Sequence, residues 1–201
     1  MYRYSDVTGL TRVVVGALWL HMTVKLVLVS IGFYAINVSG EPLSEGMTAL
    51  SGLLAVLYLL AFVASLILVG TWIYRANANA HSIGGELTIR PGWAVGWYFV
   101  PFANLVKPFQ AMKETWLASH YGSEWGRGDA PDLLNWWWGF WLLSTILGNI
   151  AWRTESAAPG LSASLDLVAG ILTVPLSLAL ISIMKQIRDA QQAVRHAEVF
   201  A

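Results

Sequence analysis

The fold is decided by the stretch Arg90–Phe109, RPGWAVGWYFVPFANLVKPF, which is as apolar as a membrane span but is interrupted by Pro101, Asn104, Lys107 and Pro108. Its apolar core, residues 93–106, has only about fourteen residues, whereas a helix needs roughly twenty to cross a bilayer. Internal proline also interrupts a helix. We therefore expect a re-entrant or interfacial element, which we call the Trp/Pro element. Its characteristic side chains are Trp93, Trp97, Pro101, Asn104, Pro108 and Trp116, of which Trp116 belongs to the helix that follows.

Composition indicates a membrane protein. Charged residues make up 12% of the chain and apolar residues 56%, whereas a soluble domain has about 25% and 45–50%. The absence of cysteine excludes disulfides and thiolate chemistry. A formal net charge of zero argues against a nucleic-acid partner, which would require a basic face. The length suits a single membrane domain, residues 1–201.

Four apolar segments of near-bilayer length surround the Trp/Pro element, two on each side: residues 11–36, 49–74, 133–152 and 163–184. The second contains Leu53–Val69, which has no charged residue. The first is too long for a signal-peptide core, so we expect it to be retained. The sequence thus predicts an all-α, integral membrane four-helix bundle. Between its second and third helices lies a cytoplasmic or interfacial segment, residues 75–132, and a cytoplasmic tail, residues 185–201, follows the last span.

The distribution of lysine and arginine predicts the orientation. The link at residues 38–48 has two glutamates and no basic residue, and the link after the third span has Arg153 alone. The central segment, by contrast, contains Arg75, Arg90, Lys107, Lys113 and Arg127. Because cytoplasmic loops are enriched in basic residues, both termini and the central segment are expected in the cytoplasm.

Small and polar residues should mark the faces where the spans meet, since lipid provides no hydrophobic drive between helices. In the fourth span these residues are Asp166, Gly170, Thr173 and Ser177, and in the third they are Asn135, Gly139 and Asn149. We expect both stripes to face inward.

Ionisable groups inside a span are candidates for a functional site. His21 and Lys25 lie one turn apart in the first span, and with Tyr58 and Asp166 they form the predicted intramembrane polar site. Two interpretations are open. Lys25 and Asp166 could form a structural ion pair, or the four side chains could relay protons or ions.

No cofactor, metal or catalytic residue is predicted. A single intramembrane histidine does not suit bis-histidine haem, and His81 and His120 have no third ligand for zinc nearby in the sequence. Nucleophile-elbow, zinc-protease and paired-carboxylate patterns do not occur. Arg75, Arg90 and Lys107 are instead candidates to contact lipid headgroups.

Three strings resemble one known family: WxxRANAN from Trp72 to Asn79, PGWAVGWYFVPFANL from Pro91 to Leu105, and the pair Glu114 and Trp116 that follows Pro108. They resemble a family of bacterial four-span membrane domains that is catalogued only as a domain of unknown function. The resemblance covers roughly residues 72–119 closely. It implies a bacterial inner-membrane protein and supplies no activity.

Three classes of function remain. The first is a non-enzymatic bundle that engages a membrane-protein partner, another copy of itself or membrane lipid through the Trp/Pro element. The second is an oligomeric small channel or transporter that uses the intramembrane polar site, because irregular backbone at membrane depth is tolerated where it lines a cavity. The third is a lipid-acting enzyme, which the absence of catalytic motifs disfavours.

Overall fold

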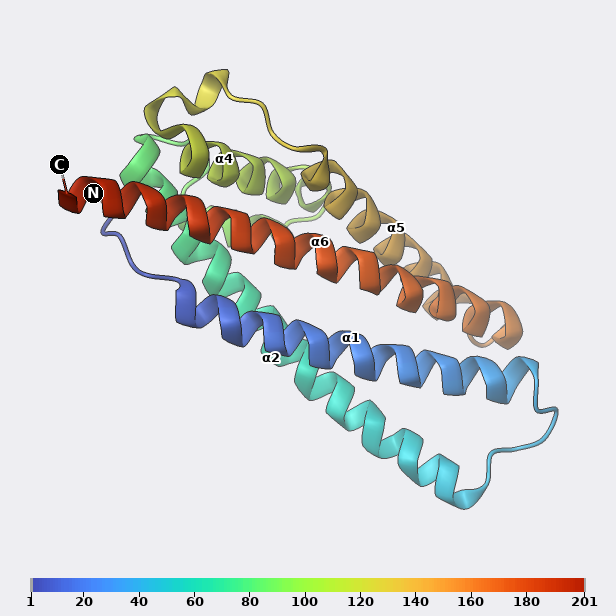
Figure 1. Ribbon diagram of the computed structural model, residues 1–201. Coiled ribbons are helices and arrows are strands. Elements are labelled where there is room, and N and C mark those ends of the chain that lie inside the picture. Colours follow the sequence, from blue (N-terminus) through green and yellow to red (C-terminus); the bar gives the residue numbers. More distant parts are fainter. Residues whose placement is uncertain (1, 201) are drawn as a thin grey trace. The chain divides into compact units, whose positions relative to one another are not determined.

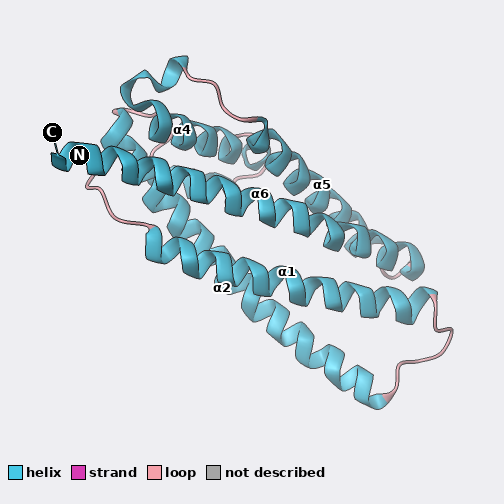
Figure 2. Cartoon of the chain, viewed as in Figure 1, coloured by secondary structure: helices cyan, strands magenta, loops and turns pink. Residues whose placement is uncertain are grey.

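The computed structural model describes residues 2–200, and the regular structure in that range is entirely helical (Figures 1 and 2). Its α-helices are α1 (Thr8–Asn37), α2 (Glu45–Gly84), α3 (Pro91–Gly96), α4 (Lys107–Tyr121), α5 (Asp132–Thr154) and α6 (Pro159–Phe200). Short 3-10 turns lie between them: η1 (Trp97–Phe99), η2 (Ala103–Leu105) and η3 (Gly122–Arg127). The all-α prediction is confirmed.

Three of these helices are long and apolar enough to cross a membrane: α1, α2 and the Pro159–Ala197 part of α6. On α2, Leu53, Leu60 and Ile67 are each at least 60% exposed. In water that exposure would cost about 25 cal/mol for each Å² of apolar surface, whereas lipid tails solvate such side chains. Helix α5 has 23 residues and is not among these three.

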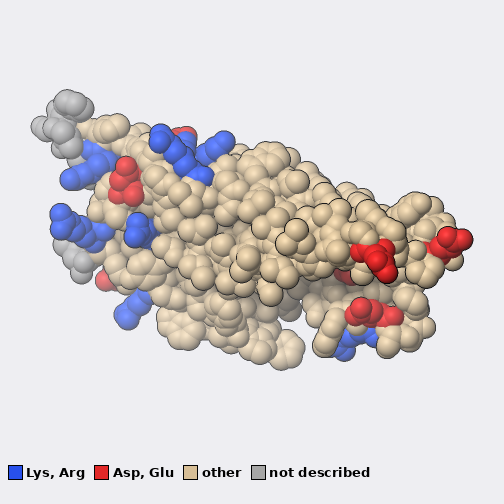
Figure 3. All heavy atoms as spheres, turned by 90° about the horizontal axis from the view of Figure 1, so that it is seen from below, with Lys and Arg blue, Asp and Glu red and all other residues tan. Residues whose placement is uncertain are grey.

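The chain forms two compact units. The apolar unit consists of Gly16–Ser65 and Trp137–Leu178, and the basic unit consists of the described parts of Met1–Val15, Leu66–Trp136 and Ala179–Ala201. Ten of the twelve lysines and arginines belong to the basic unit, all except Lys25 and Arg153. Figure 3 shows basic side chains gathered on its surface. The sequence thus places most of its positive charge in one unit and most of its spanning length in the other.

In the apolar unit, α6 packs closely against α1. A Cβ atom at Gly170 would lie 2.6 Å from Cγ2 of Val29, so only glycine fits this crossing without a shift. Thr173 and Ser177 are buried, as predicted for this face, whereas Asp166 at its outer end is exposed. A glycine therefore forms the close contact with α1, as is typical where membrane helices pack.

The inward stripe predicted for α5 is wrong. Asn135, Gly139 and Asn149 are exposed. The buried positions are instead Leu134, Trp137, Trp138 and Ala151. Two reasons account for the reversal: the large aromatic side chains have more surface to bury, and the asparagines are satisfied locally. The side-chain amide of Asn149 donates to the carbonyl of Thr145 (2.8 Å), within its own helix.

In the basic unit, α2 continues beyond the length needed for a span and ends at Gly84, with Gly85 at φ +80°. A glycine in the left-handed conformation directly after the last helical residue is a common helix C-cap. A Cβ atom at Gly84 would lie 2.8 Å from Cβ of Ala118 on α4, so this end of α2 lies against α4. Trp72 is fully buried, and its indole N–H donates to Oγ1 of Thr11 (2.9 Å).

The Trp/Pro element is not a continuous helix. Helix α3 passes into η1, the chain turns at Pro101, and η2 leads into α4. The residue before Pro91 is extended, since Arg90 has ψ 152°. The prolines therefore divide the element as predicted. Its first arm, α3 with η1, and its second arm, η2, both contact α4.

Candidate functional site

A cavity of about 360 Å³ lies between the Trp/Pro element and the start of α4, and we call it the headgroup cavity. Its lining consists of Thr88, Ile89, Arg90, Trp93, Trp97 and Lys107. The two indoles are four residues apart, and their ring centroids are separated by 4.5 Å. A guanidinium presents a planar fork of donors that matches a phosphate, and tryptophan favours the membrane–water interface. The combination suits an anionic headgroup.

Glu114 of α4 fixes the wall of the headgroup cavity. Its carboxylate accepts the backbone N–H groups of Thr88 (3.0 Å) and Ile89 (3.1 Å), and also the hydroxyl of Thr88. These three donors hold the extended segment just before Arg90. Among the described residues neither Arg90 nor Lys107 forms a salt bridge within 4.0 Å, although Nζ of Lys107 donates to the side-chain amide oxygen of Gln110 (3.1 Å). Both cations thus keep donor capacity for a ligand.

The structure brings together two of the three predicted headgroup residues. Arg90 and Lys107 share the cavity, whereas Arg75 is exposed on α2 and does not line it. Trp116 is also separate from the cavity. It is buried, and its indole N–H donates to the side-chain amide oxygen of Gln186 on α6 (3.2 Å), so its role is to join α4 to α6.

The turn of the Trp/Pro element presents an exposed aromatic side chain. Phe102 is 86% exposed and has φ +62° and ψ −41°. The N–H of Ala103 donates to the carbonyl of Pro101 (2.7 Å), which closes a three-residue γ-turn of the rare, strained type. Asn104 follows it, and its N–H donates to the carbonyl of Val100 (2.9 Å). Strain of this kind persists only where the surroundings enforce it, and it is often found at functional sites.

The predicted polar site lies in the apolar unit. The ring of His21 lies 5.2 Å from that of Tyr58 and 5.8 Å from that of Phe62, measured between centroids. Nδ1 of His21 is buried and has no hydrogen-bond partner among the described residues. Lys25 is half-buried and Asp166 is exposed. Their opposite charges act on each other, but no salt bridge within 4.0 Å joins them in the described chain.

A buried amide network in the basic unit was not anticipated from the sequence. Asn79 is fully buried on α2; its amide donates to the carbonyl of Ser5 (2.8 Å) and to Oε1 of Gln191 on α6 (2.9 Å). The side-chain oxygen Oδ1 of Asn79 accepts the backbone N–H of Ser5 (2.8 Å). One side chain thus connects the N-terminal segment, α2 and α6.

The network extends to α4. The amide of Gln191 donates to the carbonyl of Ala76 (2.9 Å) and to Oγ of Ser119 (2.9 Å). Asn77 donates to Oγ1 of Thr115 (2.9 Å). Asparagine is a poor residue for a helix interior, so the alternation Ala-Asn-Ala-Asn-Ala at residues 76–80 was the available signal that these amides have tertiary partners.

In a comparison with known protein families, residues 41–189 match the family described as Domain of unknown function (DUF4328). This region contains α2 to α5 and most of α6. Comparisons with curated proteins and with solved structures gave no significant match.

Proposed function

The chain belongs to the DUF4328 family, a domain of unknown function, and from its geometry we propose that it is a non-enzymatic integral membrane protein that binds an anionic lipid through its Trp/Pro element. The observation that carries the proposal is the headgroup cavity, in which Arg90 and Lys107 flank two tryptophans. A phosphodiester would lie between the two cations, and the indoles would pack against the glycerol and upper acyl region. Basic residues near an anionic bilayer surface each contribute about 1 kcal/mol.

The proposed topology has four spans in the inner membrane of a bacterium, with both termini cytoplasmic. Helix α5 would provide the fourth span. Its 23 residues give about 35 Å at 1.5 Å per residue, enough for a hydrocarbon core of about 30 Å. An even number of crossings leaves the basic termini and the basic central segment on the same side. The gathering of ten of the twelve basic residues in one unit supports this arrangement.

The Trp/Pro element would then enter the cytoplasmic leaflet without crossing it. Phe99 and Phe102 are 69% and 86% exposed, and Leu105 and Val106 beside them are also exposed. Such an apolar tip is costly in water and favourable in acyl chains. Because the backbone between the two arms is held in a γ-turn, Phe102 would act as a fixed wedge beneath the headgroup cavity.

Single cysteines test this topology, since the chain has no cysteine of its own. In intact cells a membrane-impermeant maleimide is expected to label Ser44→Cys and Ala158→Cys, and to label Arg127→Cys only after permeabilisation. Phe102→Cys is expected to resist labelling from both sides, because lipid excludes the reagent. External labelling of Arg127→Cys would contradict the proposed orientation, and free labelling of Phe102→Cys would contradict the buried tip.

Lipid binding is tested with the double variant Arg90→Gln and Lys107→Gln. In detergent, added phosphatidylglycerol is expected to raise the melting temperature of the wild type, because a ligand that binds only the folded state stabilises it. We expect the variant's apparent affinity to fall by about tenfold or more, the equivalent of about 1.4 kcal/mol or more. Lys113→Gln is the matched control, because Lys113 is exposed on α4 and does not line the cavity. Equal losses in both proteins would refute a specific site.

A second candidate function, an oligomeric channel or transporter, rests on Nδ1 of His21, which has no hydrogen-bond partner within residues 2–197. A buried polar atom at membrane depth needs a partner, which water in a pathway could provide. The discriminating measurement is a double-mutant cycle on melting temperature with Lys25→Met and Asp166→Asn. We expect a coupling of about 0.5 kcal/mol or more, as for a structural pair. Additive losses would favour a water-lined site instead.

A further inference from the structure

A short extended segment, residues 87–90, leads into the headgroup cavity, and we call it the strap. Its side chains alternate between two sides, as in any extended chain: Leu87 and Ile89 are buried, whereas Thr88 and Arg90 are exposed. Arg90 is the last residue of the strap and lines the cavity. The backbone conformation of the strap therefore determines where the guanidinium of Arg90 can reach.

His81, near the end of α2, holds the strap through both nitrogens of its ring. Nε2 lies 3.1 Å from the carbonyl oxygen of Ile89, and the backbone N–H of Leu87 donates to Nδ1 (3.4 Å). A carbonyl can only accept and an N–H can only donate, so the two contacts require one tautomer, in which Nε2 carries the proton. One imidazole thus bonds to both buried residues of the strap.

The strap is also held from α4, by Glu114. Its carboxylate accepts the N–H groups of Thr88 (3.0 Å) and Ile89 (3.1 Å). Together with the two bonds to His81, four backbone groups of three consecutive residues are bonded to two side chains. Backbone polar groups that lose their partners away from water are costly. The conformation of the strap therefore depends on His81 and Glu114.

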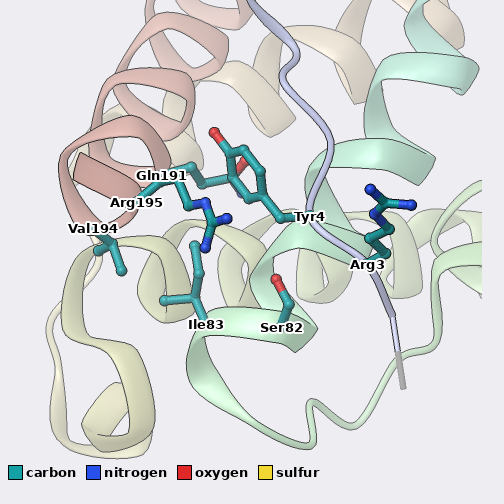
Figure 4. A pocket seen from close by; sticks show the side chains of 7 residues that line it. All are labelled: Arg3, Tyr4, Ser82, Ile83, Gln191, Val194 and Arg195. Carbon is teal, nitrogen blue, oxygen red and sulfur yellow. The ribbon is translucent and has the colours of Figure 1, made fainter. Parts of the chain in front are cut away.

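The N-terminal segment packs against His81. The ring of Tyr2 lies 5.1 Å from the imidazole, measured between centroids. Ser5 of the same segment exchanges two hydrogen bonds with the side-chain amide of Asn79 on α2 (both 2.8 Å). Figure 4 shows this segment running past the end of α2, beside a second cavity of about 330 Å³. His81 thus contacts the N-terminal segment as well as the strap, and these contacts restrict the movement of its ring.

We propose that His81 is a positioning residue of the headgroup cavity, which fixes the strap so that Arg90 is held ready for the lipid phosphate. The proposal rests on the lipid-binding function proposed above. His81 does not line the cavity itself, so its effect on the lipid passes through Arg90. Ordering a flexible segment on binding costs affinity, and a strap that is ordered in advance avoids this cost.

The test is a titration of phosphatidylglycerol into the detergent-purified full chain, in which the rise in melting temperature reports the apparent affinity. We expect His81→Leu, which has no hydrogen-bonding atom, to weaken binding by about three- to tenfold. In the Arg90→Gln background the same change should add less than about twofold, because the two residues act as one unit. His196→Leu is the matched control, since His196 is exposed on α6 and does not line the cavity. It should bind like the wild type.

Two conservative variants separate positioning from a general loss of stability. The amide nitrogen of glutamine lies the same number of bonds from Cα as Nε2 of histidine, so His81→Gln keeps the donor to Ile89. The amide oxygen of asparagine corresponds to Nδ1 in the same way, so His81→Asn keeps only the contact of 3.4 Å with Leu87, which is long for a hydrogen bond. We expect His81→Gln to bind within about twofold of the wild type and His81→Asn to bind as weakly as His81→Leu.

The outcomes distinguish this role from lipid binding itself. If phosphatidylglycerol does not stabilise the wild type, the headgroup site is refuted, and its positioning residue with it. If the wild type binds and Arg90→Gln weakens binding, but His81→Leu binds like the wild type, only the role of His81 is wrong. Equal weakening by His81→Leu in both backgrounds would also overturn that role. Should His81→Leu fail to fold, equal affinities of His81→Gln and His81→Asn would overturn it.

Discussion

Replacing Asn79 by aspartate is expected to lower the melting temperature of the detergent-purified protein by roughly 10 °C at neutral pH, corresponding to about 3–5 kcal/mol. The substitution changes a single atom in size and shape, so it leaves no cavity. It removes both donors of the amide. The new carboxylate oxygen then faces the carbonyl of Ser5 and Oε1 of Gln191, which are both acceptors.

Gln191 cannot turn its amide to compensate. Its nitrogen already donates to the carbonyl of Ala76 and to Ser119, and the hydroxyl of Ser119 in turn donates to the carbonyl of Thr115 (2.7 Å). A reversed amide would place its oxygen against the carbonyl of Ala76. The repulsion at residue 79 is therefore locked in by the rest of the network, which makes the expected loss larger than that of one hydrogen bond.

The loss should depend on pH. Burial against two acceptors would raise the pKa of Asp at position 79 in the folded state above its unfolded value. The loss in free energy of unfolding relative to the wild type is then smallest below the pKa that the new carboxyl has in the unfolded state. It grows as the pH rises toward the pKa of that carboxyl in the folded state. We expect the difference in melting temperature to be smaller at pH 5 than at pH 8. A difference independent of pH would contradict the proposed network.

Gln110→Glu is the matched control for this amide-to-carboxylate change. Gln110 lies on α4 and is only partly buried, and its oxygen accepts from Nζ of Lys107 (3.1 Å), a contact that glutamate retains. We expect a change within about 0.5 kcal/mol, as for most surface substitutions. If Gln110→Glu and Asn79→Asp cost the same, the buried network does not carry the stability assigned to it.

Much of the helical framework could be predicted because a bilayer imposes constraints that are local in sequence. Length and apolarity alone identified the segments that became α1, α2 and α6. The prolines indicated where the Trp/Pro element is divided. Each of these features depends on a few neighbouring residues, so no knowledge of tertiary contacts was needed.

The candidate sites were less predictable because they depend on residues that are far apart in the chain. Arg90 and Lys107 share a cavity only because the Trp/Pro element folds back, whereas Arg75 is fixed on the outer side of a continuous helix. Asn79 was noted as part of a family string, but its partner Gln191 is 112 residues away. Whether a side-chain amide is buried depends on its tertiary neighbours. The spacing of polar and apolar residues along the sequence does not identify those neighbours.

The reversed face of α5 has a similar cause. Polar stripes predict the inner face of a membrane helix when their side chains need partners from other helices. The asparagines of α5 bond within their own helix, and the amide of Asn149 reaches the carbonyl of Thr145. A helix that satisfies its own polar groups can expose them and bury tryptophan instead.

Gly170→Ala is expected to destabilise the protein by about 2–3 kcal/mol, a fall in melting temperature of roughly 5–10 °C. The new Cβ would lie 2.6 Å from Cγ2 of Val29 and 3.5 Å from its Cβ and Cγ1. Valine is β-branched and holds essentially one rotamer in a helix, so it cannot turn aside. Helix α6 must therefore move away from α1, and the contacts beside the crossing are lost.

Helix propensity makes this a demanding test, since alanine is favoured over glycine in a helix by about 1 kcal/mol. Gly139→Ala on α5 is the matched control, because a Cβ atom at residue 139 would have no atom within 4 Å beyond those of its own stretch of helix. That variant should melt at the wild-type temperature or slightly above it. Combining Gly170→Ala with Val29→Ala removes the methyl groups in conflict and should recover most of the loss. If the double variant is no more stable than Gly170→Ala alone, the two residues do not meet, and the close crossing of α1 and α6 in the apolar unit is wrong.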